Sequence, residues 1–476
     1  MSVSRQGYRG PGLALLEKHE VGVWSEVEAR TSSGTFHGIV LPRSETSDDM
    51  HLVLKLASGY NVGLHVETVE KLIELGRKEA AYKIPEKEFP KDPEKPFVKL
   101  FGTGGTIASR LDYRTGAVIP AFSPGELYGS VPELADYCNL ETEKLYGVFS
   151  ENMGPEQWIG LAKAIEKQVR AGADGIIIGH GTDTMHHTAA LLSFMLKNPP
   201  VPIVMVGSQR SSDRPSSDAA LNLIHAAKTA ATGEIAEVMV CMFGPTSDQY
   251  GLLHRGTRVR KMHSSYRSTF RTLSDRPLAT ISREELNPLC ECYRKRSFAT
   301  LGETNHSPEA RAEAMKDFEV TAVFDDRISI VYYYPGMKAD IFDSLVEKGY
   351  KGIVIAGTGL GHVNRDVYPA ILRATQAGVS VFMTVQTLWG YAQMYVYETG
   401  RELMGMGVMP LANMLPEVAY MKLGWALGQT DDVLEVARIM TTPNSSDMTP
   451  REPHDGYLVY QGGLPELEAF VKRTRK

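Results

Sequence analysis

The stretch VKLFGTGGTIAS, residues 98–109, decides the fold of this chain. It opens with a short, mostly apolar run, which is the pattern of a buried strand. The glycines at 102, 104 and 105 then break the run and favour a sharp turn. A buried strand that ends in a small polar loop is typical of a parallel sheet covered by helices.

The same unit of apolar strand, small polar loop and helix recurs along the chain. A first set follows in DGIIIGHGTDTMHHTAALLSFML (174–196), VPIVMVGSQRSSDRPSSDAALNLIHAA (201–227) and EVMVCMFG (237–244). A second set comprises RISIVYYYPG (327–336), KGIVIAGTGLGHV (351–363), VSVFMTVQTLWG (379–390) and a helical ending, EVAYMKLGWALGQ (417–429). We therefore predict an α/β fold with a parallel sheet in each of two lobes, joined by a charged stretch from about 271 to 326.

The chain begins differently, with a small β-rich module that we expect to be barrel-like. Short strands are predicted in SEVEARTSSGTFHGIVLP and HLVLKLASGYNVGLHV, and a closing helix in ETVEKLIELGRKEA, residues 67–80. Alternating prolines and charges then predict an extended linker. The expected organisation is a β-rich domain at 1–85, a linker at 86–97, a large lobe at 98–290, a connecting segment at 291–326, a smaller lobe at 327–440 and a C-terminal extension at 441–476.

Composition places the chain among ordinary globular proteins. It has 476 residues, 43% of them hydrophobic, and a formal net charge of −6. An acidic chain of this kind binds nucleic acid only through a local patch. The four cysteines lack metal-site spacing, the N-terminus lacks the pattern of a signal peptide, and no apolar run is long enough for a membrane span. We therefore expect a cytoplasmic protein with no membrane association.

Ligands of open α/β sheets bind in the loops at the carboxyl ends of the strands, so these loops are the candidate site. The loop at 102–106 invites a phosphate-loop interpretation, but no Gly-Lys-Ser/Thr follows, and Ile107 stands where a dinucleotide motif needs glycine. The alternative is that the glycines present the hydroxyl of Thr106 to a ligand. A threonine hydroxyl attacks only when a base takes its proton.

Partners for Thr106 are found in two other segments. Thr182 and Asp183 follow an apolar run and offer a hydroxyl and a carboxylate, although a helix N-cap is the alternative interpretation. Lys261 lies among arginines that disfavour its protonated form, so it is a candidate base. A solvated basic loop or an anion-binding patch is the alternative for Lys261. His186 and His187 are helix neighbours that we expect to point apart, which argues against a metal site.

Five segments, in this order, resemble the bacterial-type L-asparaginase/glutaminase family. They are GTGGTIAS (102–109), SENMGPEQW (150–158), GHGTDTM (179–185), GSQRSSDRPSSDAALNL (207–223) and RVRKMHSSYRSTF (258–270). The resemblance covers about 95–435 and implies hydrolysis of a side-chain amide through a threonyl ester, with no metal and no organic cofactor in this chain.

The resemblance also implies a role for each matching residue. Thr106 matches the nucleophile, and Thr182, Asp183 and Lys261 match the second threonine, its aspartate and the lysine. Asp183 is also expected to bind the substrate α-ammonium. The other matches are Tyr113 near the nucleophile, Ser150 on the substrate α-carboxylate and the backbone at Ser208 as an oxyanion donor. Glu151 stands where the family has glutamine; it is expected to bind substrate by strengthening the hold on the α-ammonium, and an exposed glutamate without such a role is the alternative.

The additional N-terminal module resembles the architecture of the archaeal glutamyl-tRNA(Gln) amidotransferases, which contain an asparaginase-like subunit. This resemblance implies that L-glutamine supplies ammonia to a partner, the amidotransferase E subunit, which holds glutamyl-tRNA(Gln) and uses ATP and Mg²⁺. A homodimer within a heterotetramer is the expected assembly. Two alternatives remain: a free cytosolic L-asparaginase with a regulatory N-terminal module, and a non-catalytic amino-acid-binding protein on the same fold.

Overall fold

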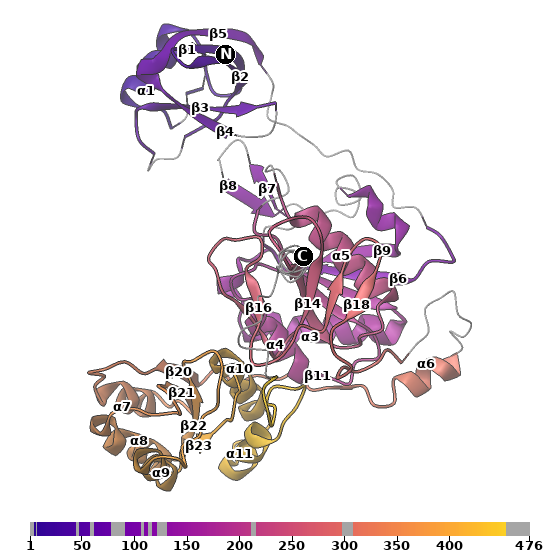
Figure 1. Cartoon of the computed structure of the whole chain (residues 1–476), viewed down its shortest axis with the longest axis vertical. Helices are drawn as coiled ribbons and strands as arrows, with labels where there is room; N and C mark the ends of the chain where they lie inside the picture. Colours follow the sequence, from indigo (N-terminus) through magenta and orange to yellow (C-terminus); the bar gives the residue numbers. More distant parts are fainter. Residues whose placement is uncertain are drawn as a thin grey trace, which may run out of the picture.

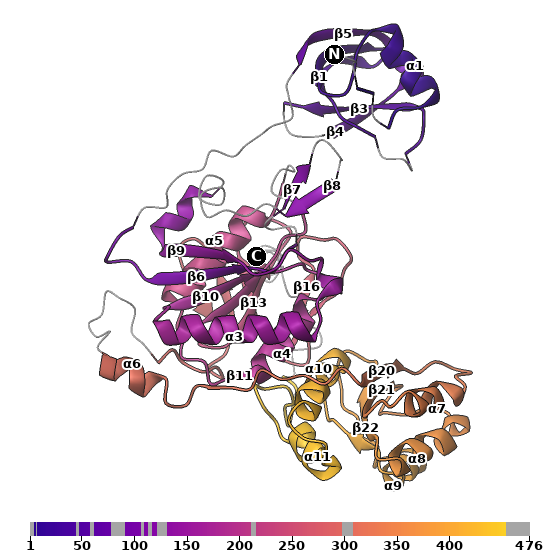
Figure 2. The same cartoon turned by 180° about the vertical axis from the view of Figure 1, so that it is seen from behind.

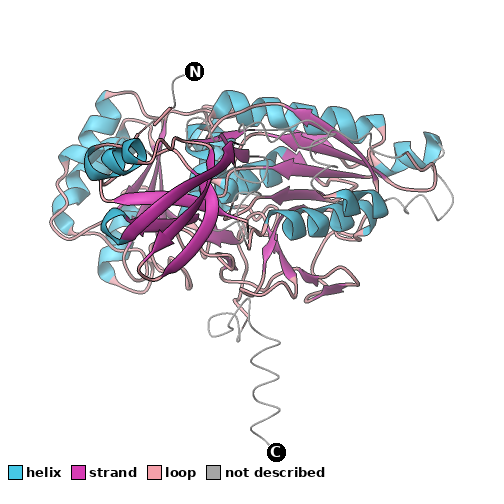
Figure 3. Ribbon diagram, turned by 90° about the horizontal axis from the view of Figure 1, so that it is seen from above, coloured by secondary structure: helices cyan, strands magenta, loops and turns pink. Residues whose placement is uncertain are grey.

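A computed structural model describes most of the chain, and the lobes are seen from three sides in Figures 1, 2 and 3. The described residues are 4–5, 7–43, 47–57, 61–77, 91–105, 109–112, 117–120, 131–210, 216–297 and 308–453. Within them lie an N-terminal β-rich module, a large α/β lobe and a smaller α/β lobe, which we call the C-lobe (Figure 1). The predicted α/β class is confirmed.

The N-terminal module is an antiparallel sheet with one helix. Strands β1 (Ser25–Thr31), β2 (Gly34–Val40), β3 (His51–Leu56) and β4 (Asn61–His65) confirm the predicted strands. The order in the sheet is β4-β3-β2-β1-β5. Helix α1 (Gly10–Lys18), which the sequence analysis missed, buries Leu16 in the core of this module.

The helix predicted at 67–80 is wrong, because this stretch forms strand β5 (Val69–Arg77) after the short turn η1 (Val66–Thr68). Its apolar residues fit either a helix or a strand period. Pairing decides between them: β5 runs antiparallel along the free side of β1, from Ser25↔Arg77 to Thr31↔Val69. Without β5, that side of β1 would present unpaired backbone groups.

The large lobe contains an eight-stranded sheet in the order β18-β17-β14-β13-β12-β10-β6-β9. Strands β9, β6, β10, β12 and β13 are parallel neighbours, as predicted, whereas β14, β17 and β18 extend the sheet in antiparallel pairs. The bounds are β6 (Phe97–Gly102), β9 (Asn139–Lys144), β10 (Gly175–Gly179), β12 (Ile203–Val206), β13 (Val238–Phe243), β14 (Gly251–Arg255), β17 (Ala279–Ile281) and β18 (Leu286–Pro288).

The charged stretch from about 271 does not begin as a connection, because β16 (Phe270–Thr272) ends there and β17 and β18 follow it. These strands lie within the bounds 98–290 expected for the large lobe. Leu278, Ala279 and Ile281 lie in the core on the α5 side of the sheet, so the stretch is held by burial. The later part contains helix α6 (Pro308–Ala314) and β19 (Glu319–Val320), which pairs with β11 (Leu196–Lys197).

Helices cover both faces of the large sheet. Ile176 and Ile178 of β10 pack on the side of α3 (Pro155–Ala171) and α4 (Met185–Met195), and Ile177 packs on the side of α5 (Ala219–Thr232). Shorter elements complete the lobe: η3 (Pro132–Asp136), η4 (Ser150–Asn152) and the hairpins β7 (Ser109–Asp112) with β8 (Ala117–Pro120) and β15 (Val259–Lys261) with β16.

The C-lobe is a smaller parallel sheet that shares a core with the large lobe. Its strands lie in the order β20 (Ile328–Tyr332), β21 (Gly352–Gly357), β22 (Ser380–Val385) and β23 (Met409–Pro410). Helix α10 packs against α4, and the rings of Phe194 and Trp425 stack at 5.8 Å between centroids. The helical elements are α7 (Asp340–Glu347), η5 (Arg365–Val367), α8 (Tyr368–Gln376), α9 (Glu398–Gly405), α10 (Pro416–Leu427) and α11 (Val433–Thr441). In the described part of the chain, no helix is long and apolar enough to cross a membrane.

Candidate active site

The candidate site lies where three neighbouring parallel strands of the large lobe end. Gly179 of β10 is in register with Gly102 of β6 and with Val206 of β12. The loops that follow these strands therefore begin side by side. Thr103 ties the first loop to the second, because its backbone N–H and its hydroxyl both donate to the Gly179 carbonyl, each at 3.0 Å.

Close backbone packing joins these loops to the segment that begins at Ser150. Gly105 has φ +88°, and a Cβ there would lie 2.5 Å from the backbone nitrogen of Gly181. A Cβ on Gly181 would in turn lie 2.7 Å from the Cβ of Ser150. Only residues without side chains allow this approach. The next residue, Thr106, and also Tyr113 lie outside the described residues, so their roles stay predictions.

Lys261 binds both residues that the sequence analysis paired with it. Its Nζ donates to Thr182 Oγ1 at 2.9 Å and to Asp183 Oδ1 at 2.7 Å. The lysine side chain is only 9% exposed, whereas that of Asp183 is 69% exposed. The ammonium is therefore held beneath the carboxylate, and the carboxylate remains accessible to a ligand.

The structure shows neither a helix N-cap at Thr182 and Asp183 nor a solvated basic loop at Lys261. Helix α4 begins at Met185 with Thr184 as its N-cap residue, and Thr182 bonds to Lys261 instead. Lys261 is the last residue of β15, is mostly buried, and reaches across to the β10 loop, so it is not part of a solvated basic loop.

Three further predicted residues lie around this cluster. Ser150 is buried, and its carbonyl accepts a hydrogen bond of 2.6 Å from the Thr184 hydroxyl. Glu151 is exposed beside it. Ser208 is buried two residues after the end of β12. Thr184 was missed by the sequence analysis, although its place in GHGTDTM was the available signal.

A chain of hydrogen bonds supports the loop from below. The ring of His180 is fully buried and contacts the Gly181 carbonyl through Nδ1, at 2.7 Å, and the Thr188 hydroxyl through Nε2, at 2.9 Å. Trp158 Nε1 donates to the same hydroxyl at 3.1 Å. Burial lowers the pKa of His180 to about 4, so the ring is neutral at pH 7.

His186 and His187 do not point apart as predicted, since their ring centroids are 4.3 Å from each other. Burial lowers the pKa of both rings, to about 4 for His187, and the nearby Arg260 acts in the same direction. Both rings are therefore neutral at pH 7. In the described ranges, no group of three or more His, Cys, Asp or Glu side chains is arranged for metal binding.

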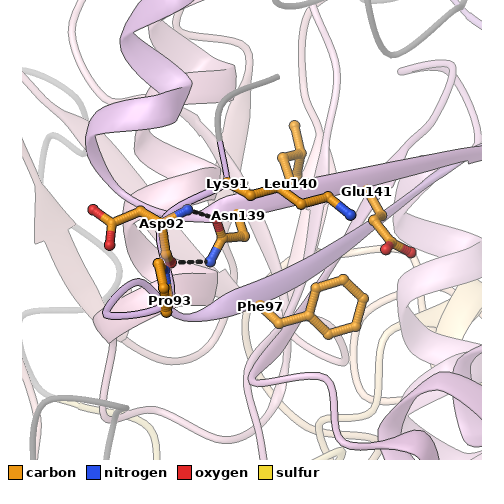
Figure 4. Close-up of a pocket in the computed structure, with 7 residues that line it drawn as sticks. All are labelled: Lys91, Asp92, Pro93, Phe97, Asn139, Leu140 and Glu141. Atoms are coloured by element: carbon orange, nitrogen blue, oxygen red, sulfur yellow. Dashed lines mark hydrogen bonds between the residues drawn. The ribbon is translucent and has the colours of Figure 1, made fainter. Parts of the chain in front are cut away.

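A cavity of about 430 Å³ lies at the opposite end of the sheet, where β6 and β9 begin (Figure 4). Asn139, at the start of β9, accepts from the Asp92 backbone N–H and donates to the Asp92 and Lys95 carbonyls. These hydrogen bonds anchor the chain that leads into β6. The lining residues of the cavity are Lys91, Asp92, Pro93, Phe97, Asn139, Leu140 and Glu141.

The two-lobed fold and the Thr182, Asp183 and Lys261 cluster define an asparaginase-type amidohydrolase. Family models agree with this class: "Asparaginase, N-terminal" matches residues 97–291, and "Glutaminase/Asparaginase C-terminal domain" matches 327–440. Among solved structures, the thermostable L-asparaginase from Thermococcus kodakarensis aligns with TM-score 0.62 and 27% identity, over 74% of this chain and 99% of its own. L-asparaginase I from Vibrio cholerae aligns with TM-score 0.60 and 25% identity, over 75% and 99%.

The N-terminal module narrows this class further. Residues 23–75 match the family model "GatD N-terminal domain". The glutamyl-tRNA(Gln) amidotransferase D subunit of Thermococcus kodakarensis is 46% identical over 93% of this chain and 98% of its own length. The D subunit of Methanothermobacter thermautotrophicus is 45% identical over 92% and 96%. The chain belongs to the family of glutamyl-tRNA(Gln) amidotransferase D subunits.

Proposed function

We propose that this protein hydrolyses L-glutamine and delivers the ammonia for the conversion of glutamyl-tRNA(Gln) to glutaminyl-tRNA(Gln). The observation that carries the proposal is the contact of Lys261 Nζ with Thr182 Oγ1 and Asp183 Oδ1 at the carboxyl end of β10. A lysine that donates to both a hydroxyl and a carboxylate supplies the parts that amide hydrolysis by a hydroxyl nucleophile needs.

In the proposed reaction, the hydroxyl of Thr106 attacks the side-chain carboxamide carbon of glutamine. The C–N bond breaks, the hydroxyl proton leaves with the amide nitrogen as ammonia, and a threonyl ester remains. Water then cleaves the ester, which releases glutamate and restores the hydroxyl. Lys261 and Thr182 exchange the protons, and Tyr113 assists at Thr106.

Binding of the amino acid uses the exposed side of the same cluster. Asp183 takes the α-ammonium, because its carboxylate is the accessible partner of the buried lysine. Ser150 takes the α-carboxylate from the neighbouring segment, and the backbone at Ser208 donates to the oxyanion. Each oxyanion donor contributes about 10²–10³-fold to the rate.

The partner in this proposal is the amidotransferase E subunit, which holds glutamyl-tRNA(Gln) and uses ATP and Mg²⁺ to activate its glutamyl group. This chain needs no cofactor of its own, and two copies associate with two partner subunits. Membership of the family supports this part. The relatives named as D subunits of the glutamyl-tRNA(Gln) amidotransferase align with this chain over nearly their whole length.

The test is ammonia release from glutamine and from asparagine, with and without the partner protein and glutamyl-tRNA(Gln). Slow glutamine hydrolysis that the partner and the charged tRNA accelerate supports the proposal, and Thr106→Ala abolishes it. Brisk asparagine hydrolysis that no partner alters identifies a free asparaginase instead. An unchanged rate in Thr106→Ala contradicts the proposed nucleophile.

A further inference from the structure

The strand that carries Lys261 contacts both lobes. Strand β15 is only three residues long, and alternate side chains of a strand point to opposite sides. Val259 lies in the core that α4 shares with the large sheet, and Lys261 reaches Thr182. Arg258, which directly precedes β15, and Arg260 instead reach residues of the C-terminal half of the chain.

Arg258 is the stronger of these two links. Its side chain is fully buried, and three of its donors are engaged. Nη1 donates to the Asn413 carbonyl at 2.9 Å, Nη2 to Asn413 Oδ1 at 3.2 Å and Nε to the Ser446 carbonyl at 2.8 Å. Arg260 adds a contact of 3.2 Å with the buried carboxylate of Glu417, at the start of α10.

The segment 442–449, which we call the strap, fixes the acceptors of Arg258. Thr449 bonds to Asn413 through its backbone N–H at 2.9 Å and its hydroxyl at 2.7 Å. Asp447 forms a fully buried ion pair of 2.6 Å with Lys422 of α10. Ser445 returns to the large lobe, where its hydroxyl donates to the Ser193 carbonyl and its carbonyl accepts from Thr257.

We propose that Arg258 is a positioning residue for amide hydrolysis: it fixes β15 against the C-lobe and the strap, so that Lys261 stays within hydrogen-bonding distance of Thr182 and Asp183. This inference rests on the function proposed above. Arg258 touches neither residue of the cluster and acts only through the backbone of β15. A displacement of about 1 Å at a reacting group can cost roughly 100-fold in rate, so a distant anchor has a measurable effect.

The primary experiment compares Arg258→Met with Lys261→Met and with the double variant. Methionine keeps an unbranched apolar side chain but removes the guanidinium, so all three hydrogen bonds of Arg258 are lost. Each buried acceptor left without a partner costs about 1–3 kcal/mol, so the folding of this variant is checked. We expect kcat for glutamine to fall about 10-fold or more in Arg258→Met while KM changes less than about 3-fold. In the Lys261→Met background the same change should lower kcat no further, because residues that act through one contact are not additive.

Two further variants separate positioning from general destabilisation. Arg258→Lys retains the charge, so it should recover a substantial part of kcat. Arg296→Met is the matched control, because Arg296 is also a mostly buried arginine bonded to backbone carbonyls, including that of Ala231, but it lies at the opposite end of β10 from the site. It should lower stability and leave kcat unchanged.

The outcomes decide between the two proposals. The positioning role is overturned if kcat is unchanged in Arg258→Met. It is also overturned if Arg258→Met lowers kcat as much in the Lys261→Met background as in the wild type, or if Arg296→Met lowers kcat as much as Arg258→Met does. Wild-type activity in Lys261→Met overturns the proposed function itself.

If Arg258→Met does not fold, Asn413→Ala replaces it, since this change removes one acceptor of Arg258 and both contacts with Thr449. A smaller loss of kcat, again absent with Lys261→Met, supports the proposal, and no loss overturns it.

Discussion

The two lobes place a glycine-containing loop after a central parallel strand, yet only one loop gathers reactive side chains. In the large lobe, the loop after β10 presents Thr182 and Asp183 to Lys261. In the C-lobe, the loop after β21 closes on itself: Thr358 and His362 exchange backbone hydrogen bonds of 3.0 and 2.9 Å, and the Thr358 hydroxyl donates to the His362 carbonyl.

The difference shows what a sheet edge supplies and what it does not. A parallel strand end provides a turn at which ligands are often bound. The chemistry of the large lobe depends on a third element, the β15–β16 hairpin, which carries Lys261 to the loop from about 80 residues further along the chain. In the C-lobe loop, the hydroxyl of Thr358 instead donates to a backbone carbonyl of the same loop.

The largest effect is expected when Lys261 is removed, because the difference between the two loops then disappears. Lys261→Met should lower kcat for glutamine by about 10²–10⁴-fold, the usual range for the loss of a positioned proton-transfer group. Steady-state ammonia release measures the effect, and circular dichroism of the variant checks that it is folded. A loss of less than about 5-fold contradicts a chemical role for Lys261.

A smaller loss of activity is expected when a side chain is added at Gly181, in the loop after β10. Gly181→Ala places a Cβ 2.7 Å from that of Ser150, so the loop must shift. Because a displacement of about 1 Å at a reacting group can cost roughly 100-fold in rate, we expect kcat/KM to fall by about 10–100-fold. The matched change is Gly359→Ala in the C-lobe loop, where φ is +54° and no atom lies within 4 Å. It should cost about 1–2 kcal/mol of stability and leave activity unchanged. Equal activities of the two variants would contradict the assignment of the site to the large lobe.

We expect low pH to destabilise the fold through His180, which lies in the loop after β10. The pKa of His180 falls from 6.5 to about 4 on folding, so the unfolded chain binds its proton first as the pH drops. Its contribution to stability is complete above pH 6.5 and is lost as the pH falls toward 4, by about 2 kcal/mol at pH 5. Urea unfolding at pH 7 and pH 5 measures this loss, which should shrink in His180→Gln. An identical pH dependence in that variant contradicts the prediction.

The smallest effect is expected at the rim of the site. Glu151 is exposed, and exposed charge pairs contribute about 0.2–1 kcal/mol, so Glu151→Gln should change KM for glutamine by less than about 3-fold. Asp183→Asn is the contrasting variant and should raise KM strongly. A large effect of Glu151→Gln would make it part of the binding site.

Much of this protein was predictable from its sequence because the signals are local. Apolar runs before glycine-containing loops predicted β6, β10, β12, β13, β20, β21 and β22, all of which are confirmed. The pairing of Lys261 with Thr182 and Asp183 followed from residue chemistry and from the family resemblance, and the structure confirms the contact. The roles of Thr106 and Tyr113 remain predictions.

The errors arose where pairing partners decide the structure. The segment that forms β5 has a pattern that suits a helix, and only the free side of β1 makes it a strand. The short strands β17 and β18 lie in a charged stretch without a clear period, and they form because the edge of β14 accepts them. No local pattern shows that Arg258 bonds to residues 155 and 188 positions away.

The sequence by itself determined the α/β class, the family and the residue types of the site. The reason is that strand periodicity, turn glycines and reactive side chains are local patterns, visible within short segments of the chain. The tertiary structure alone decided that β15 lies between two lobes, that Gly105 packs on the backbone of Gly181 and Gly181 on the side chain of Ser150, and that the strap holds Arg258. These arrangements depend on burial and hydrogen bonding between distant segments, and such contacts leave no periodic trace in the chain.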